Sequence, residues 1–130
     1  MTLMVCLDDR NGLLFNKRRQ SRDKALIEDA LAFVKDERIT TDSYTAQLFP
    51  EDAVAVSEEP FSGSVCFAER GDFLAFRSSV NQLVVYRWNR NYPADTYFPL
   101  DEYIGSMKMV ETSEFPGNSH DKITREVYRR

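Results

Sequence analysis

Short apolar runs, separated by turn-forming residues, predict a fold that is rich in β-strands. Residues 3–7 form one such run, which ends at a turn signal where Asn11-Gly12 supplies positive φ. Residues 83–88 give the strongest strand signal, because they are mainly apolar, β-branched and aromatic. Further strands are expected at residues 38–41, 54–56, 63–67, 107–111 and 123–128, of which the last two alternate inward and outward side chains.

A helix is expected after the first strand. Apolar residues recur at helical spacing after Ser21, which is a good N-cap, and the pattern stops near Lys35-Asp36. A second, short helix is expected from an Asp42-Ser43 cap to Phe49, because Pro50 cannot continue it.

Residues 13–15 are expected to form a loop, and residues 71–76 fit either a strand or a short helix. Strands and helices alternate early in the chain, and antiparallel strands follow late. The pattern therefore predicts an α/β class with a mixed, mostly parallel central sheet, antiparallel C-terminal strands and flanking helices. A length of 130 residues fits a single domain over residues 1–130.

Composition narrows the range of functions. No run of the roughly 18 apolar residues that cross a bilayer is present, so no membrane partner is expected. The first residues read as a buried strand and not as a signal peptide, because no basic segment precedes them, so a cytoplasmic location is expected. The net charge of −4 argues against general nucleic-acid binding. A basic cluster nevertheless stands out, made of Lys17, Arg18, Arg19, Arg22 and Lys24.

Cysteine and histidine do not suggest a metal site. Cys6 and Cys66 lie in apolar runs, where free cysteine is commonly a small buried hydrophobe, and a cytosolic disulfide is rare. With a single histidine in the chain, no metal-ligand spacing is found, and no metal is expected.

Several segments resemble the dihydrofolate reductase family in order and in sequence. Residues 83–87 look like the central strand of that family, and Ala94-Asp95-Thr96-Tyr97-Phe98-Pro99 looks like its Gly-Asp-Thr-x-Phe-Pro motif. Residues 109–115 and 124–128 are similar to its last two strands, and residues 5–12 to its first strand and the start of its active-site loop. The resemblance implies a dihydrofolate reductase-like fold, with NADPH as cofactor and dihydrofolate as substrate.

One residue matches the position of the family's catalytic acid. The resemblance implies that an acid at the start of the first helix assists protonation of the pterin ring, and Gln20-Ser21-Arg22-Asp23 puts Asp23 in that place. Burial that raised the pKa of this carboxyl would suit it to proton transfer. The alternative is that Asp23 only favours the helix N-terminus through charge–dipole attraction.

The positions that bind NADPH phosphates in the family differ here. The family uses a Gly-Arg-x-Thr turn at a helix N-terminus, which reads Asp42-Ser43-Tyr44-Thr45 in this chain, and a Gly-Gly pair, which reads Ala68-Glu69. Only Thr45 keeps its identity as a cofactor-binding residue. Two carboxylates repel a pyrophosphate, and the segment between Val56 and Val65 is too short for the elements that hold the adenosine end. Ordinary NADPH binding is therefore not expected.

Folate contacts are altered as well. The arginine that holds the glutamate tail falls at Glu51-Asp52, and Lys17-Arg18-Arg19 replaces the apolar Leu-Pro-Trp of the active-site loop. The resemblance places seven residues at the substrate cleft: Val5, Cys6, Phe15, Arg18, Arg19, Arg22 and Tyr86. It also implies that Asp95 and Thr96 support the loop of residues 11–16, unless they merely cap a turn after Pro93.

Three hypotheses follow for function. The first is a binding protein that has lost dihydrofolate reduction and holds a small anionic or nucleotide-like ligand through its arginines, although a charge run is often only a solvated face. The second is an active NADPH-dependent reductase of dihydrofolate or a related pterin. The third is a protein-binding inhibitor or regulator, of the kind carried by phages or mobile elements, that meets a protein partner through its acidic surface.

Overall fold

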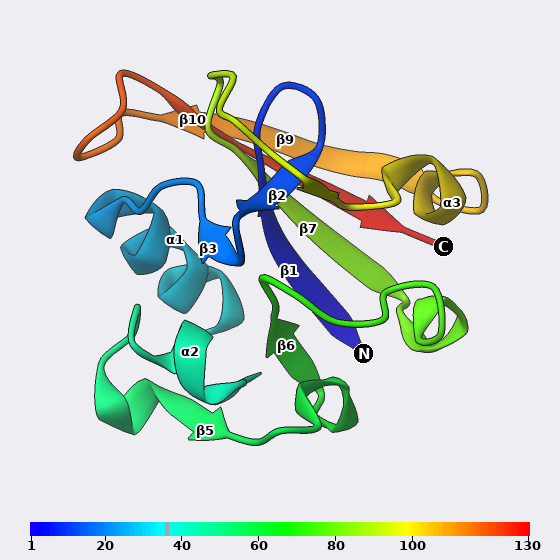
Figure 1. Ribbon diagram of the computed structural model, residues 1–130. Coiled ribbons are helices and arrows are strands. Elements are labelled where there is room, and N and C mark those ends of the chain that lie inside the picture. Colours follow the sequence, from blue (N-terminus) through cyan, green and yellow to red (C-terminus); the bar gives the residue numbers. More distant parts are fainter. Residues whose placement is uncertain (36) are drawn as a thin grey trace.

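A seven-stranded sheet with the order β5-β4-β6-β1-β7-β10-β9 forms the centre of the molecule (Figure 1). The computed structural model describes residues 1–35 and 37–130. The main-sheet strands are β1 (Thr2–Leu7), β4 (Ile39–Thr41), β5 (Val54–Val56), β6 (Val65–Phe67), β7 (Gln82–Arg87), β9 (Lys108–Phe115) and β10 (Ile123–Arg129). The helices are α1 (Lys24–Val34), α2 (Ser43–Ala46) and α3 (Leu100–Ile104).

Strand direction agrees with the expected class. β1 pairs in parallel with β6 and with β7, and β4 pairs in parallel with β5 and β6. β10 then pairs antiparallel with both β7 and β9. The prediction of a mixed, mostly parallel sheet with antiparallel C-terminal strands is confirmed. Because the parallel strands share a direction, their carboxyl ends meet at one edge of the sheet, which is where open α/β sheets gather functional groups.

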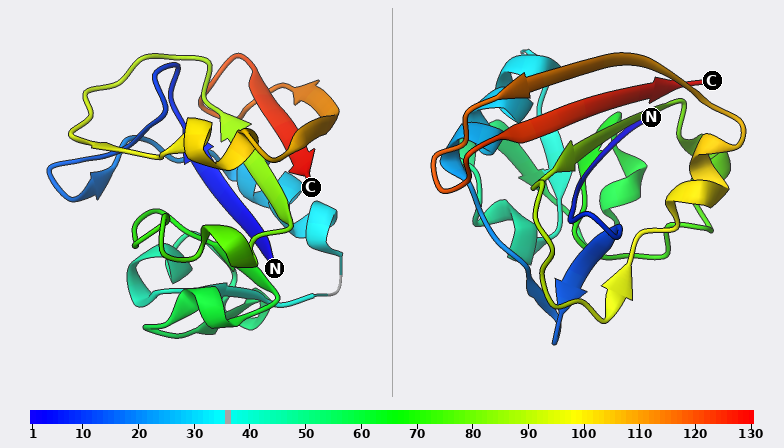
Figure 2. Two further views of the ribbon diagram at one scale, coloured as in Figure 1. Left: turned by 90° about the vertical axis from the view of Figure 1, so that its right-hand side faces the viewer. Right: turned by 90° about the horizontal axis from the view of Figure 1, so that it is seen from above.

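Side chains alternate along β1, and so they separate two apolar layers. Leu3, Val5 and Leu7 pack on the face that carries α3, whereas Met4 packs on the face that carries α1. Figure 2 shows these two helices on opposite sides of the sheet. Both faces of the central strands are thus covered, which explains why β1 and β7 read as continuous apolar runs in the sequence.

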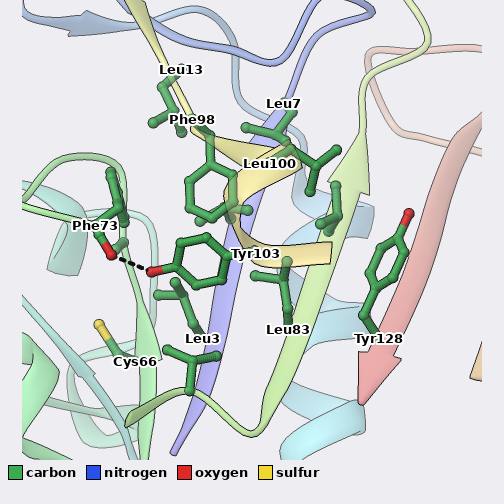
Figure 3. Close-up of a cluster of buried hydrophobic side chains, with 14 of the residues drawn as sticks. Leu3, Leu7, Leu13, Cys66, Phe73, Leu83, Phe98, Leu100, Tyr103 and Tyr128 are labelled. Carbon is green, nitrogen blue, oxygen red and sulfur yellow. Dashed lines mark hydrogen bonds between the residues drawn. The ribbon is translucent and has the colours of Figure 1, made fainter. Parts of the chain in front are cut away.

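The layer beneath α3 contains a buried hydroxyl, that of Tyr103 (Figure 3). Its O–H donates to the backbone carbonyl of Phe73 at 2.5 Å, and burial raises the pKa of Tyr103 to about 12. The hydrogen bond ties α3 to the loop after β6. That loop, residues 71–76, is neither the strand nor the helix that the sequence allowed; it turns, and a single 3₁₀ turn, η3 (Arg77–Ser79), follows it.

A small second sheet lies beside the carboxyl ends of the parallel strands. It has the order β3-β2-β8, formed by β2 (Gly12–Phe15), β3 (Arg18–Arg19) and β8 (Thr96–Tyr97). The expectation of a loop at residues 13–15 was therefore wrong, because β2 finds partners on both of its edges. β3, β8 and α3 were not predicted, since β3 and β8 have two residues each and none of the three elements carries an apolar run or a readable periodicity.

Helix boundaries also required correction. Asp23, and not Ser21, is the N-cap of α1, because its side chain accepts a hydrogen bond from the N–H of Ala25. Lys35 is the C-cap, so the helix ends where expected, while Asp36 lies outside the described residues. α2 stops at Ala46, three residues before the predicted end.

The connections around β5 are short. A 3₁₀ turn, η1 (Glu51–Ala53), precedes β5, and another, η2 (Pro60–Ser62), is the regular element between β5 and β6. In the part of the chain that the structure describes, no helix is long and apolar enough to cross a membrane.

Candidate functional site

The candidate site lies at the carboxyl ends of β1, β4, β6 and β7, where the loop that carries β3 reaches across the sheet. Arg19 of β3 forms a two-pronged ion pair with Glu69, just after β6: Nε and Nη2 donate to the two carboxylate oxygens at 2.8 and 2.9 Å. Thr45 of α2 donates its hydroxyl to the same carboxylate at 2.9 Å. Glu69 is thus almost fully buried and has partners on both oxygens.

A second ion pair lies next to the first. Asp42 is the N-cap of α2, accepts from the N–H of Thr45 at 2.8 Å, and is paired with Arg70 at 3.0 Å. Burial alone would raise the pKa of Asp42, but these hydrogen bonds and the Arg70 charge hold it below its usual value. The ring of Tyr44 joins the two pairs, because the guanidinium of Arg19 lies 4.1 Å and that of Arg70 5.2 Å from its centroid.

These contacts alter the sequence-based argument about Asp42 and Glu69. The resemblance leads us to expect cofactor phosphates near both carboxylates, but each carboxylate is neutralised by an arginine of the same chain. Simple charge repulsion was therefore an incomplete reason against phosphate binding. The groups that would donate hydrogen bonds to a phosphate, Arg19 and Thr45, are already bound to Glu69.

The cleft that the resemblance assigns to a substrate is nearly filled. Between α1, β1 and β3 only about 20 Å³ remains, which is room for about one water molecule. Cys6, Arg19, Gln20, Asp23 and Trp88 are among the residues around it. The Oε1 atom of Gln20 is buried without a hydrogen-bond partner, so a water molecule in this space would satisfy it.

Asp23 is fully engaged by the turn between β9 and β10. Its carboxylate accepts from the N–H groups of Ala25, Asn118 and Ser119 at 2.8 to 2.9 Å, and it contacts Nδ1 of His120 at 2.9 Å. Burial would raise the pKa of Asp23, but these hydrogen bonds outweigh burial and hold it well below its usual value. The carboxyl is therefore ionised near neutral pH, which argues against its use as a proton donor and agrees with a capping role.

His120 extends this cluster. Its Nε2 lies 2.8 Å from the hydroxyl of Tyr92 and 3.3 Å from that of Ser21, and its ring stacks on Trp88 with centroids 4.8 Å apart. Gly117 is required in the same turn, because a Cβ there would lie 2.7 Å from Asp23 Oδ2. The cluster fastens the β9–β10 turn to the start of α1.

Three of the predicted substrate-binding residues lie in the sheet. Val5 is fully buried in the layer under α3, away from the cleft. Tyr86 is also fully buried, and its O–H donates to Asp29 of α1 at 2.7 Å; burial, together with this bond, raises its pKa far above the usual value. Cys6 does line the cleft, and burial and the Glu69 charge raise the pKa of its thiol.

The other predicted contacts lie at the surface. Phe15 and Arg18 are exposed and border a shallow depression of about 310 Å³ together with Arg19 and Tyr92. Arg22 is exposed, and its backbone carbonyl accepts from the Ser119 hydroxyl at 2.8 Å. The structure therefore brings Cys6, Arg19, Arg22 and Asp23 together around the cleft and places Val5, Phe15, Arg18 and Tyr86 elsewhere.

Asp95 contacts the loop that the resemblance assigned to it. Its Oδ2 accepts from the N–H of Asn16 at 3.0 Å, and its own N–H donates to the carbonyl of Leu14. Thr96 pairs with Leu14 in the small sheet. Both residues are exposed, so they hold the rim of the site and not its interior.

Sequence reasoning missed a large pocket, which lies beyond the two ion pairs. It has a volume of about 640 Å³ between η2 and the loop of residues 70–76, and Phe61 and Phe76 form part of its wall. It also missed His120, which the sequence shows only as a turn residue. Both Cys6 and Cys66 are free thiols, and within residues 1–35 and 37–130 no group of three or more metal-ligating side chains comes together.

Comparison with solved structures defines the class of this fold. The chain is similar to dihydrofolate reductase from Enterococcus faecalis, solved in complex with NADP(H) and RAB-propyl, with a TM-score of 0.64 and 13% sequence identity. The similarity covers 99% of this chain and 95% of that one. No protein-family model and no curated protein matches the sequence. The protein therefore has the dihydrofolate reductase fold, and at this identity the likeness extends to the fold alone.

Proposed function

We propose that this protein binds a small ligand on a dihydrofolate reductase frame and does not carry out NADPH-dependent reduction of dihydrofolate. The observation that carries the proposal is the network of Arg19, Glu69 and Thr45, which lies where the resemblance leads us to expect the cofactor phosphates. A dinucleotide would have to separate Arg19 from an almost buried carboxylate before it could use that guanidinium. Breaking such a pair costs roughly 3 kcal/mol, which reduces the affinity by about two orders of magnitude.

The state of the acid supports the same conclusion. A reductase of this kind needs a group near the pterin that assists proton transfer. Asp23 has its oxygens taken by the α1 N-terminus and the β9–β10 turn, and its pKa lies well below the usual value. A space of about 20 Å³ at this place has no room for a pterin ring.

Ligand binding, in contrast, has space elsewhere in the fold. The pocket of about 640 Å³ has the size of typical small-molecule sites. The arginines that suggested an anionic ligand support it less well than the sequence implied, because the charge of Arg19 is compensated by Glu69 and Arg18 lies on an open surface.

The test measures turnover and cofactor binding separately. NADPH oxidation is followed by absorbance with dihydrofolate as substrate, and NADPH affinity by calorimetry, with an authentic dihydrofolate reductase as the positive control. We expect no turnover above the rate without protein, and an NADPH affinity weaker by about two orders of magnitude than that of the control. Turnover that disappears in Asp23→Ala would overturn the proposal.

A further inference from the structure

We propose that the pocket between η2 and residues 70–76 is a site for a small organic cation with a flat, apolar body. This inference rests on the proposed function, because it names the class of ligand for a binding protein. The pocket has a volume of about 640 Å³, and its lining includes Asp42, Glu58, Glu59, Phe61, Arg70, Asp72 and Phe76. One side of it is formed by η2, the regular element in the short connection from β5 to β6.

Aromatic rings form the apolar wall of the pocket. Phe61 stacks on Phe76, with ring centroids 4.6 Å apart and planes 11° from parallel, and it meets Phe73 edge-on at 5.8 Å. Gly71 has a φ of +143°, and a Cβ there would lie 2.7 Å from the Phe61 ring, so the glycine allows the ring to lie against the backbone. Phe73 is buried and anchors the cluster, whereas Phe76 stays partly exposed and offers a ring surface to a ligand.

The side chains at the rim of the pocket carry mainly negative charge. Asp42 is compensated by Arg70 at 3.0 Å. Glu58, Glu59 and Asp72 take part in no ion pair among the described residues, and all three are exposed at the mouth of the pocket. The local field is therefore negative, and it repels phosphates and carboxylates.

Aromatic faces and carboxylates together select one ligand chemistry. The negative face of a phenyl ring attracts cations, and a planar cation can stack on it while its charged end reaches a carboxylate. An anion gains from neither feature, and a neutral ring gains only from stacking. The three carboxylates that take part in no ion pair line the same pocket as the aromatic wall, so a cation with a flat body satisfies both parts of the site. Nucleotides and folates, which are anionic, do not.

The experiment compares three probes of nearly the same shape: benzamidine (a cation), benzamide (neutral) and benzoate (an anion). Binding to the whole chain is followed by two-dimensional NMR, which also locates the site through the amides of residues 58–76. We expect benzamidine to bind at least about tenfold more tightly than benzamide, and benzoate to bind more weakly still. Raising the salt from about 50 to about 500 mM should weaken benzamidine binding severalfold.

Substitutions at the surface of the pocket test each part of it. Glu59→Gln with Asp72→Asn should reduce benzamidine affinity toward that of benzamide, and Phe76→Ala should reduce the affinity for both probes. These residues are exposed, so the variants are expected to fold, and matching spectra will check this. Glu28→Gln with Asp101→Asn removes two exposed carboxylates, one on α1 and one on α3, outside the pocket, and serves as the control of equal charge change.

The outcomes separate this inference from the proposed function. The cation site is refuted if benzamide or benzoate binds as tightly as benzamidine, if benzamidine shifts no amide of residues 58–76, or if the Glu59→Gln/Asp72→Asn variant binds it unchanged. If benzamide or benzoate binds as tightly as benzamidine, the proposal that the protein binds a small ligand still holds. Turnover of dihydrofolate with NADPH would refute the proposed function, whatever the probes do.

Discussion

The strength of the Arg19–Glu69 ion pair can be measured with substitutions that remove each charge separately and then both charges together. Arg19→Met and Glu69→Gln keep the approximate size of each side chain, and the double variant removes both charges. The structure gives two hydrogen bonds of 2.8 and 2.9 Å between these residues, with side chains only 15% and 9% exposed. The pair is therefore a partly desolvated one, for which coupling is larger than at an open surface.

The magnitude follows from this geometry. Two charges about 4 Å apart attract by about 4 kcal/mol at an effective dielectric constant of 20, and partial exposure of Arg19 reduces the coupling to roughly 2–3 kcal/mol. The single variants should differ. Arg19→Met leaves the Glu69 carboxylate buried with Thr45 as its remaining partner and should cost roughly 3 kcal/mol. Glu69→Gln should cost about half of that, since Arg19 can swing into solvent.

The assay is urea unfolding of the four proteins, followed by the fluorescence of the single tryptophan, Trp88, which is buried beside the cleft. A second measurement titrates inorganic pyrophosphate by calorimetry. Glu69→Gln frees Arg19 and Thr45 and should gain pyrophosphate affinity by at least about tenfold over the original protein. The reasoning is refuted by a coupling energy below about 0.5 kcal/mol, or by pyrophosphate binding that is as tight before the substitution as after it.

Three further predictions concern stability. Asp23→Asn should lower the free energy of unfolding by roughly 2–4 kcal/mol near neutral pH, as measured by urea titration. Because folding lowers the pKa of Asp23, the stability that its carboxylate contributes is present above about pH 4 and is lost as the pH falls. The stabilities of the variant and of the original protein should therefore converge in acid, and a difference that stays constant with pH would contradict this. Tyr103→Phe should cost about 1–2 kcal/mol, because the carbonyl of Phe73 loses its donor, and a neutral result would show that water replaces the hydroxyl. Asp95→Ala should speed amide exchange at Asn16 and leave the urea midpoint unchanged, whereas a shifted midpoint would mean that the contact supports more than the loop.

Patterns of apolar residues predicted most of the main sheet, because the continuous apolar runs of β1 and β7 and the alternation of β10 extend over six or seven residues. α1 was predicted for the same reason, although its cap was placed two residues too early. β2 was read as a loop, since its partners lie in β3 and β8 and neither strand is longer than two residues. Cross-strand partners of this kind decide such elements, and no local signal reports them.

The sequence indicated which strand ends carry the candidate site, but it did not indicate which side chains contact one another there. The resemblance drew attention to Asp42 and Glu69, yet it gave no reason to pair Glu69 with a residue 50 positions earlier. A basic residue in the loop, together with an acidic residue at the facing strand end, was the signal that could have suggested the pair. His120 carried no such signal, because its partners Asp23, Tyr92 and Ser21 come from two other parts of the chain.

In this molecule the loops around the cleft are held by the chain itself. The loop with β3 is held by Arg19 on Glu69, and the β9–β10 turn is held by the carboxylate of Asp23. In a protein whose loops are ordered by a cofactor, the free energy of unfolding rises with the concentration of the cofactor, and the cofactor-free protein lacks this stabilisation. Here the same positions form intramolecular contacts, which require no ligand and compete with one. The fold tolerates these intramolecular contacts in place of ligand contacts because its two apolar layers lie elsewhere. They lie between the sheet and α1 and between the sheet and α3, away from the strand ends that carry these charged side chains. A cleft closed in this way adds stability to the frame, and it leaves the pocket beyond α2, where Glu58, Glu59 and Asp72 take part in no ion pair among the described residues, as the place for the proposed ligand.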